Sequence, residues 1–201
     1  MNMNYRETVL LEKAYRLLNH GPTICVSAAH NGQQNIMTAA WNMPLDFAPS
    51  KVAVVLDKQT WTRQLLEASG TFAISVPTRA QVNLAQQIGS LSGAALLRDT
   101  QKDKITTLNL QTFTGTTTQA PLLEDCVAWL ECKLIIEPHI QQTYDLFLGE
   151  VTAAWADTRV FSQGHWHFEG HDELRTIHHV AGGHYFIAGQ AIQSSATGPS
   201  D

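Results

Sequence analysis

The sequence lacks the features that mark several specialised classes of protein. Charged residues are only 15% of the 201 residues, and the formal net charge of −5 leaves no basic excess that would attract nucleic acid. No apolar run approaches the roughly 20 residues that a membrane helix needs. Residues 1–20 mix charged side chains with leucines, unlike a signal peptide. We therefore expect a cytoplasmic protein that binds neither nucleic acid nor membrane.

Cysteine is scarce, and the familiar catalytic motifs are missing. The three cysteines have no metal-type spacing, so we expect reduced thiols, with Cys25 in the core. Neither a G-x-G-x-x-G fingerprint nor a P-loop is present, which argues against a Rossmann or P-loop protein. No G-x-S-x-G elbow supports a serine hydrolase.

Among the residue types that bind metals, histidine is concentrated in one segment of the chain. Six of the nine histidines fall between His165 and His184. His165 and His167 would share a strand face, as zinc ligands can, whereas His178 and His179 would point apart. Because no spaced cysteine or H-E-x-x-H motif accompanies them, we predict no metal site. A non-enzymatic module that binds a metal through these histidines stays open as an alternative.

Short runs rich in Val, Ile and Thr predict a mainly β protein. Asn31-Gly32 predicts a hairpin turn between the first two runs, because a type I′ turn needs positive φ at both central residues. The predicted strands are antiparallel and form a barrel or sandwich. They cover Thr23–Ala29, Asn35–Asn42, Val52–Asp57, Thr71–Val76, Asp125–Glu137 (half-buried), Tyr144–Trp155 and His184–Ile187.

A few short helices interrupt these strands. We expect a helix over Tyr5–Leu18, one from Thr60 to Gly70, and one from Thr78 to about Gly89. Gly89–Lys104 is predicted to be a long loop and Thr106–Thr118 an edge strand or mobile hairpin. Residues 1–189 would form a single domain, followed by a disordered tail over residues 190–201.

Three segments carry residues that could bind a ligand. In Asn35–Trp41, small side chains would let a flat ligand approach the strand backbone. In Asp57–Thr62 a helix begins after a strand, and its free N–H groups could hold a phosphate. Gly89–Gly93, with Lys104 further on, supplies flexible backbone, hydroxyls and cations. Taken singly, the three are better explained as a barrel strand, an ordinary helix cap and a solvated loop.

Further motifs follow in a fixed order. They are Ser69–Pro77, Asn83-Leu84-Ala85, Ser92-Gly93, Asp103-Lys104, Phe147–Val151 and Tyr185–Gly189. Together with Asn35–Trp41, they resemble the flavin reductase-like family of FMN-binding split barrels, in particular its flavoredoxin group. The resemblance covers roughly residues 13–189.

This resemblance implies an antiparallel Greek-key split β-barrel that forms a homodimer, with FMN near the subunit interface. The backbone of the first segment would line the isoalloxazine ring, the second would hold the phosphate, and the third would close over the flavin. The implied cofactor-binding residues are Asn35, Met37, Thr38, Ala39, Ala40, Trp41, Lys58, Thr60, Trp61, Thr62, Asn83, Ser92, Gly93, Lys104 and Tyr185. The flavin would carry the chemistry, so no side chain is assigned as catalytic.

The sequence departs from the family pattern in three places. Ala94–Leu97 is inserted in the third segment, and Ile105 replaces an aromatic residue. Many reductases of the family have Gly-Asp-His, associated with nicotinamide use, where this chain has Gln142–Asp145. Two functions therefore stay open: an NAD(P)H-dependent flavin reductase, and a flavoredoxin-type electron-transfer protein that a partner protein reduces.

Overall fold

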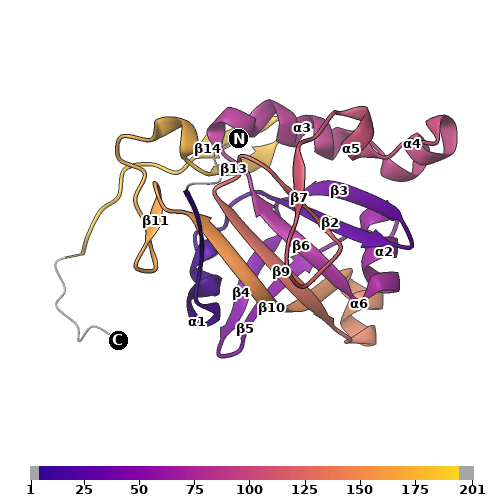
Figure 1. Cartoon of the computed structure of the whole chain (residues 1–201), viewed down its shortest axis with the longest axis horizontal. Helices are drawn as coiled ribbons and strands as arrows, with labels where there is room; N and C mark the ends of the chain where they lie inside the picture. The colour runs from indigo at the N-terminus through magenta and orange to yellow at the C-terminus, as the bar shows by residue number, and fades with distance from the viewer. Residues whose placement is uncertain (1–4, 195–201) are drawn as a thin grey trace.

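A computed structural model describes residues 5–194 of the chain. Its centre is an eight-stranded antiparallel sheet (Figure 1). β1 (Arg6–Thr8) pairs with one end of β10. The other strands run in the order β3 (Gln33–Ala39), β2 (Ile24–His30), β6 (Thr71–Val76), β9 (Ala128–Ile135), β10 (Leu146–Asp157), β5 (Ser50–Val55) and β4 (Asn42–Phe47).

The two strands at the ends of this order, β3 and β4, are joined by a short link in the chain. β3 and β4 are consecutive in the chain, and only Ala40 and Trp41 join them. The N–H of Asn42 donates to the carbonyl of Ala40, and the N–H of Val55 donates to the carbonyl of Trp41. The predicted mainly β, antiparallel split-barrel fold with a few short helices is confirmed. Asn31 and Gly32 have φ of 49° and 76°, as the predicted hairpin turn requires.

Smaller elements surround the sheet. Three hairpins are formed by β7 (Thr112–Thr114) with β8 (Pro121–Leu123), β11 (Phe161–Ser162) with β12 (His165–Trp166), and β13 (Ile177–Ala181) with β14 (His184–Ile187). The helices are α1 (Leu11–Ala14), α2 (Trp61–Ser69), α3 (Val82–Ser90), α4 (Gly93–Thr100), α5 (Lys104–Thr107) and α6 (Pro138–Tyr144), with 3₁₀ turns η2 (Tyr15–Leu17), η3 (Arg79–Gln81) and η4 (Asp172–Leu174). In Figure 1, α3, α5 and α4 form a row along one side of the sheet.

The sheet is buried on both faces. Val26, Ile74 and Leu130 belong to a cluster inside the barrel, whereas Cys25, Ala73 and Trp129 pack into a second cluster on the other face. This arrangement corrects the prediction that the strand within Asp125–Glu137 is half-buried. A half-buried strand would leave one face in solvent, but Trp129 and Glu131, on the face opposite Leu130, are 4% and 0% exposed.

The N-terminal prediction of a helix over Tyr5–Leu18 is wrong in its first part. Arg6–Thr8 forms β1, and only the residues from Leu11 onward turn into α1 and η2. β10 is twelve residues long, and β5 pairs with its first half alone. The pairing of Arg6 with Asp157 and of Thr8 with Trp155 covers the remaining edge, so tertiary pairing overrides the local helical pattern.

The prediction of a long loop over Gly89–Lys104 is also wrong, because it contains α4 and leads into α5. Ser92 Oγ accepts from the N–H of Ala95, and Asp103 accepts from the N–H of Thr106, so both helices have side-chain N-caps. The inserted Ala94–Leu97 consists of strong helix formers. Of Thr106–Thr118, only Thr112–Thr114 is a strand. Residues 190–194 lie in no helix or strand, and 195–201 lie outside the described residues.

Candidate functional site

The outer edge of β3 lines a groove made of two adjoining cavities, which we call the β3 groove. Their volumes are about 280 and 230 Å³, and both are lined by Thr38, Gly89 and Ser90. The first is also lined by Asn35, Met37, Gln59, Thr60, Trp61, Leu91, Ser92, Gly93 and Lys104. The second is also lined by Ala40, Ala85, Gln86, His179 and Tyr185. Within residues 5–194, β2 is the only strand that pairs with β3, so alternate backbone groups along β3 are available to a ligand.

The N-terminus of α2 closes one side of the first cavity. Thr60 occupies the N-cap position, but its Oγ1 donates to the carbonyl of Asp57 at 2.8 Å rather than capping the helix. The first-turn N–H groups of α2 therefore have no acceptor from the cap side chain. They carry the partial positive charge of a helix N-terminus, which favours an anion.

Asn35 joins the starts of α2 and α4 at the bottom of the first cavity. Its side chain is buried, and its Nδ2 donates to Thr62 Oγ1 at 2.9 Å. α4 packs so closely on this carboxamide that a Cβ added to Gly93 would lie 2.5 Å from Asn35 Oδ1. A glycine at this position is what lets α4 approach β3 and narrow the groove.

Lys104 is the one cation that lines the groove within the described chain. The side chain is 3% exposed, and its Nζ donates to the carbonyl of Ile88 at 2.8 Å. No carboxylate of the described residues forms an ion pair with it. Burial lowers the pKa of Lys104 to about 8. A largely buried ammonium with one acceptor is well placed to receive an anion.

The second cavity lies where the β13–β14 hairpin meets α3. Tyr185 donates its hydroxyl proton to Gln86 Oε1 at 2.9 Å, and burial raises its pKa. Its ring meets that of His179 edge-on, with centroids 5.1 Å apart. On the opposite wall, Thr38 Oγ1 donates to the carbonyl of Ala85 at 2.6 Å and holds α3 against β3. The cavity thus combines aromatic and hydroxyl groups with the strand edge.

Most of the sequence-predicted cofactor residues come together at this groove. Asn35, Met37, Thr38, Ala40, Thr60, Trp61, Ser92, Gly93, Lys104 and Tyr185 line it, whereas Ala39, Trp41, Lys58, Thr62 and Asn83 line neither cavity. Ala39 belongs to the core, and Thr62 lies beneath Asn35. Trp41, Lys58 and Asn83 are exposed. Whether each of these residues contacts FMN stays a prediction.

Several residues of the groove were not predicted from the sequence as cofactor ligands. They are Gln59, Ala85, Gln86, Gly89, Ser90, Leu91 and His179. Gly89, Ser90 and Leu91 fell in the third segment but were attributed to a loop rather than to the junction of α3 and α4. A signal for His179 existed in the Gly182-Gly183 turn, whose hairpin places His179 opposite Tyr185.

The histidine-rich segment is dispersed. His178 and His179 point apart, as predicted: His178 contacts His20, and His179 contacts Tyr185. Burial, with a smaller contribution from His178, lowers the pKa of His20 to about 4. Within residues 5–194, no three His, Cys, Asp or Glu side chains are grouped so that they could hold a metal ion. The described helices also include none that is long and apolar enough to span a membrane.

Comparisons with known proteins assign this antiparallel split barrel to a family. Residues 15–175 match the model of the flavin reductase like domain. The chain therefore belongs to the flavin reductase-like family.

Individual relatives cover nearly the whole chain. It is 46% identical to the FMN-binding domain of a flavin reductases-like enzyme from Shewanella baltica, with a TM-score of 0.90 over 97% of this chain and 100% of that one. It is 25% identical to the flavoredoxin of Desulfovibrio vulgaris, with a TM-score of 0.72 over 87% and 90%. It is also 42% identical to the uncharacterized protein YddH of Escherichia coli, over 90% of this chain and 94% of that protein.

Proposed function

We propose that the protein binds FMN in the β3 groove and acts as a flavin-dependent oxidoreductase. The observation that carries the proposal is the groove itself, in which a free strand edge, a helix N-terminus and a buried unpaired ammonium line one continuous space. Together the two cavities fall within the roughly 300–1,000 Å³ typical of small-molecule sites. The match to an FMN-binding relative at 46% identity supports the same ligand.

The residues present fit the two ends of FMN. Lys104 and the first turn of α2 would hold the phosphate, because both supply positive charge and donors to the first cavity. The backbone edge of β3 at Thr38 and Ala40 would face the ring system. FMN, when bound, supplies the hydride and electron chemistry. The residues of the groove would bind it, orient it and exclude water from it.

Two electron donors are compatible with this site. One is NAD(P)H, as in a flavin reductase; the other is a protein partner, as in a flavoredoxin. Many reductases carry Gly-Asp-His at the position of Gln142–Asp145. Here this segment packs against α2, because Arg63 of α2 donates to Asp145 Oδ1 at 2.5 Å and to the carbonyl of Gln141 at 3.0 Å. Because the segment is used for packing, it supports a second candidate function, in which a protein partner is the electron donor.

An absorption spectrum tests both parts of the proposal. The purified protein, or the protein after addition of FMN, is expected to show flavin bands that remain after desalting. Loss of these bands on adding NADH or NADPH without air would identify a reductase, and persistence would identify a protein-reduced carrier. Protein that retains no flavin after reconstitution would contradict the proposal.

We further propose that the protein is a homodimer, through the exposed face of β4. Every second residue from Trp41 to Phe47 is apolar and exposed: Trp41 (75%), Met43 (54%), Leu45 (45%) and Phe47 (63%). β4 is an edge strand, since it pairs only with β5. An exposed apolar face on an edge strand is expected to be covered by another protein chain. Trp41 directly follows the β3 groove, so a second copy seated here would lie next to the flavin.

Mass measurement in solution tests the dimer. The native chain is expected to elute and scatter light at twice 22.2 kDa. Met43→Glu with Phe47→Glu should yield a monomer, while Asp46→Glu on the same strand should not. A native monomer that binds FMN fully would refute the dimer. The cytoplasmic location stays a prediction, for which the buried, unpaired Cys25, Cys126 and Cys132 are a supporting feature.

A further inference from the structure

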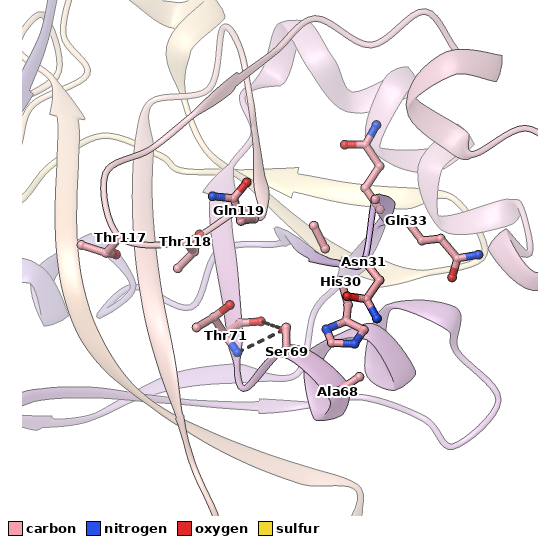
Figure 2. A pocket seen from close by; sticks show the side chains of 12 residues that line it. His30, Asn31, Gln33, Ala68, Ser69, Thr71, Thr117, Thr118 and Gln119 are labelled. Carbon is pink, nitrogen blue, oxygen red and sulfur yellow. Dashed lines mark hydrogen bonds between the residues drawn. The ribbon is translucent and has the colours of Figure 1, made fainter.

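A larger cavity of about 500 Å³ lies at the other end of α2 from the start of that helix in the β3 groove. We call it the polar cavity. It is formed by the β2–β3 hairpin over residues 29–34, the end of α2 with Thr71, and Thr117–Gln119 (Figure 2). The polar cavity and the groove share no lining residue. α2 has nine residues, so roughly 12 Å of helix separates the two sites.

Each wall of the polar cavity is held by a separate local structure. The hairpin wall is fixed by the turn at Asn31-Gly32. The end of α2 is fixed by Gly70 in the left-handed conformation and by Ser69 Oγ, which donates to the carbonyl of Thr71 at 2.9 Å. Two of the three walls are therefore ends of defined secondary structure.

The third wall is held by a buried carboxylate. Glu131 accepts from the N–H groups of Thr116, Thr117 and Thr118 at 2.8, 2.9 and 2.8 Å. A Cβ on Gly115 would collide with this carboxylate, so the preceding backbone closes tightly around it. Thr117 Oγ1 also lies 2.6 Å from Thr152 Oγ1 on β10. This anchoring sets the position of Gln119 at the rim, opposite the hairpin (Figure 2).

The lining is polar and uncharged. Among the described residues that line the cavity there is no Asp, Glu, Lys or Arg. The C-terminus of α2 adds a partial negative charge, which disfavours an anion, and a cation would find no carboxylate. The side chains of His30, Asn31, Gln33 and Gln119 form no hydrogen bond with another described residue. Carboxamides and imidazole both donate and accept, as a hydroxyl group does.

We propose that the polar cavity binds an uncharged, hydroxyl-rich small molecule: a free sugar or the ribose of a nucleoside. A hydroxyl matches this lining because it donates and accepts on one atom. No Phe, Tyr or Trp is among the described lining residues, so the base of a nucleoside would gain no stacking there and its ribose would carry the binding. The volume lies within the range typical of small-molecule sites.

Titration of the full chain as purified, followed by NMR and calorimetry, tests this inference. The probes are D-glucose, D-ribose, adenosine and adenosine 5′-monophosphate. We expect saturable binding of at least one uncharged probe. Binding of glucose or ribose would identify a free-sugar site, and binding of adenosine alone would identify a nucleoside site. Gln33→Ala with Gln119→Ala should weaken this binding at least tenfold, because two hydrogen bonds are lost.

Two further variants separate ligand binding from folding. Ala68→Phe, at an exposed position, should fill part of the cavity and abolish binding, while Gln64→Ala removes an exposed carboxamide from the same helix and should change nothing. No saturable binding of any uncharged probe would overturn the inference. Undiminished binding by Ala68→Phe would also overturn it, as would tighter binding of the monophosphate than of adenosine. Flavin affinity should be the same in all these variants.

Discussion

Lys104 and Glu131 are two buried charged side chains with opposite surroundings. Lys104, 3% exposed, lines the β3 groove and donates to one carbonyl. Glu131, 0% exposed, accepts from three backbone N–H groups and from the hydroxyls of Thr116 and Thr118. Burial alone would raise the pKa of Glu131, but these hydrogen bonds outweigh it and hold the pKa below its usual value. Burial of Lys104 is not offset in this way, and its pKa falls.

The different number of hydrogen bonds distinguishes a charge that stabilises the fold from a charge that binds a ligand. A buried charge that is fully hydrogen-bonded stabilises the fold around it, whereas a buried charge with unused donors costs stability unless a ligand completes it. Glu131 therefore belongs to the architecture of the polar cavity wall. Lys104 belongs to the proposed FMN site.

The largest expected effect is on stability, at Glu131. Glu131→Ala removes the acceptor of the N–H groups of Thr116, Thr117 and Thr118. An unsatisfied buried donor costs about 1–3 kcal/mol, and Thr118 is the buried residue of the three, so we expect a loss of roughly 3 kcal/mol. For a chain of this size that corresponds to a fall in Tm of roughly 6–12 °C. Differential scanning calorimetry measures it.

Glu150→Ala is the matched control, because Glu150 is an exposed carboxylate on the neighbouring strand β10. It should change the free energy of unfolding by less than about 0.5 kcal/mol. If Glu131→Ala were no more destabilising than Glu150→Ala, Glu131 would not be the structural charge of the pair.

The next expected effect is on FMN affinity, at Lys104. Lys104→Met keeps a side chain of similar length and removes the charge. A hydrogen bond to a charged group is worth roughly 1.5–3 kcal/mol, so FMN binding should weaken about 10- to 150-fold. Binding of riboflavin, which lacks the phosphate, should barely change. Tm without ligand should hold or rise, because an uncompensated buried ammonium is removed. Equal weakening for both flavins would move the phosphate away from Lys104.

How far the sequence predicted these features depended on the range of the interactions. Thr71–Val76 and His184–Ile187 match β6 and β14 because local pattern and turn residues define them. The strand β4 was missed because strands disfavour proline and aspartate, here Pro44 and Asp46, and because its pairing with β5 decides it. The N-terminal strand was missed for the same reason, because the partner of Arg6–Thr8 lies about 150 residues away in sequence.

The site shows the same limit. Asn35, Thr38 and Ser92 were found because they belong to local motifs. Lys104 was included through a motif, yet its burial beneath Ile88 follows only from the packing of α3 against α5. His179 reaches the groove through a hairpin far along the chain. Glu131 holds a threonine-rich segment through hydrogen bonds to its backbone. The alternation of residues along the strand does not predict this role.

A smaller effect is expected from pH. The proton on Lys104 is lost near pH 8 in the free protein. Bound phosphate would favour the charged ammonium and raise this pKa. FMN affinity should therefore be constant between about pH 7 and 8 and fall above pH 8, by up to tenfold per pH unit until the pKa of the complex is reached. Fluorescence titrations at pH 7, 8, 9 and 10 measure this, and Lys104→Met should show a flat profile. A native profile as flat as that of the variant would contradict the assignment.

The smallest expected effect is at Lys58, which precedes α2 but is exposed and lines neither cavity of the groove. An exposed ion pair is worth about 0.2–1 kcal/mol, because water and salt screen it. Lys58→Ala should therefore weaken FMN binding by at most about fivefold, and the effect should disappear at high salt. The effect of Lys104→Met should persist there, because burial protects that charge from screening. Equilibrium titrations of both variants at about 0.05 and 0.5 M salt compare the two cations directly. A loss of 10- to 150-fold in Lys58→Ala, insensitive to salt, would make Lys58 the phosphate ligand and show that the loop before α2 closes over the bound cofactor.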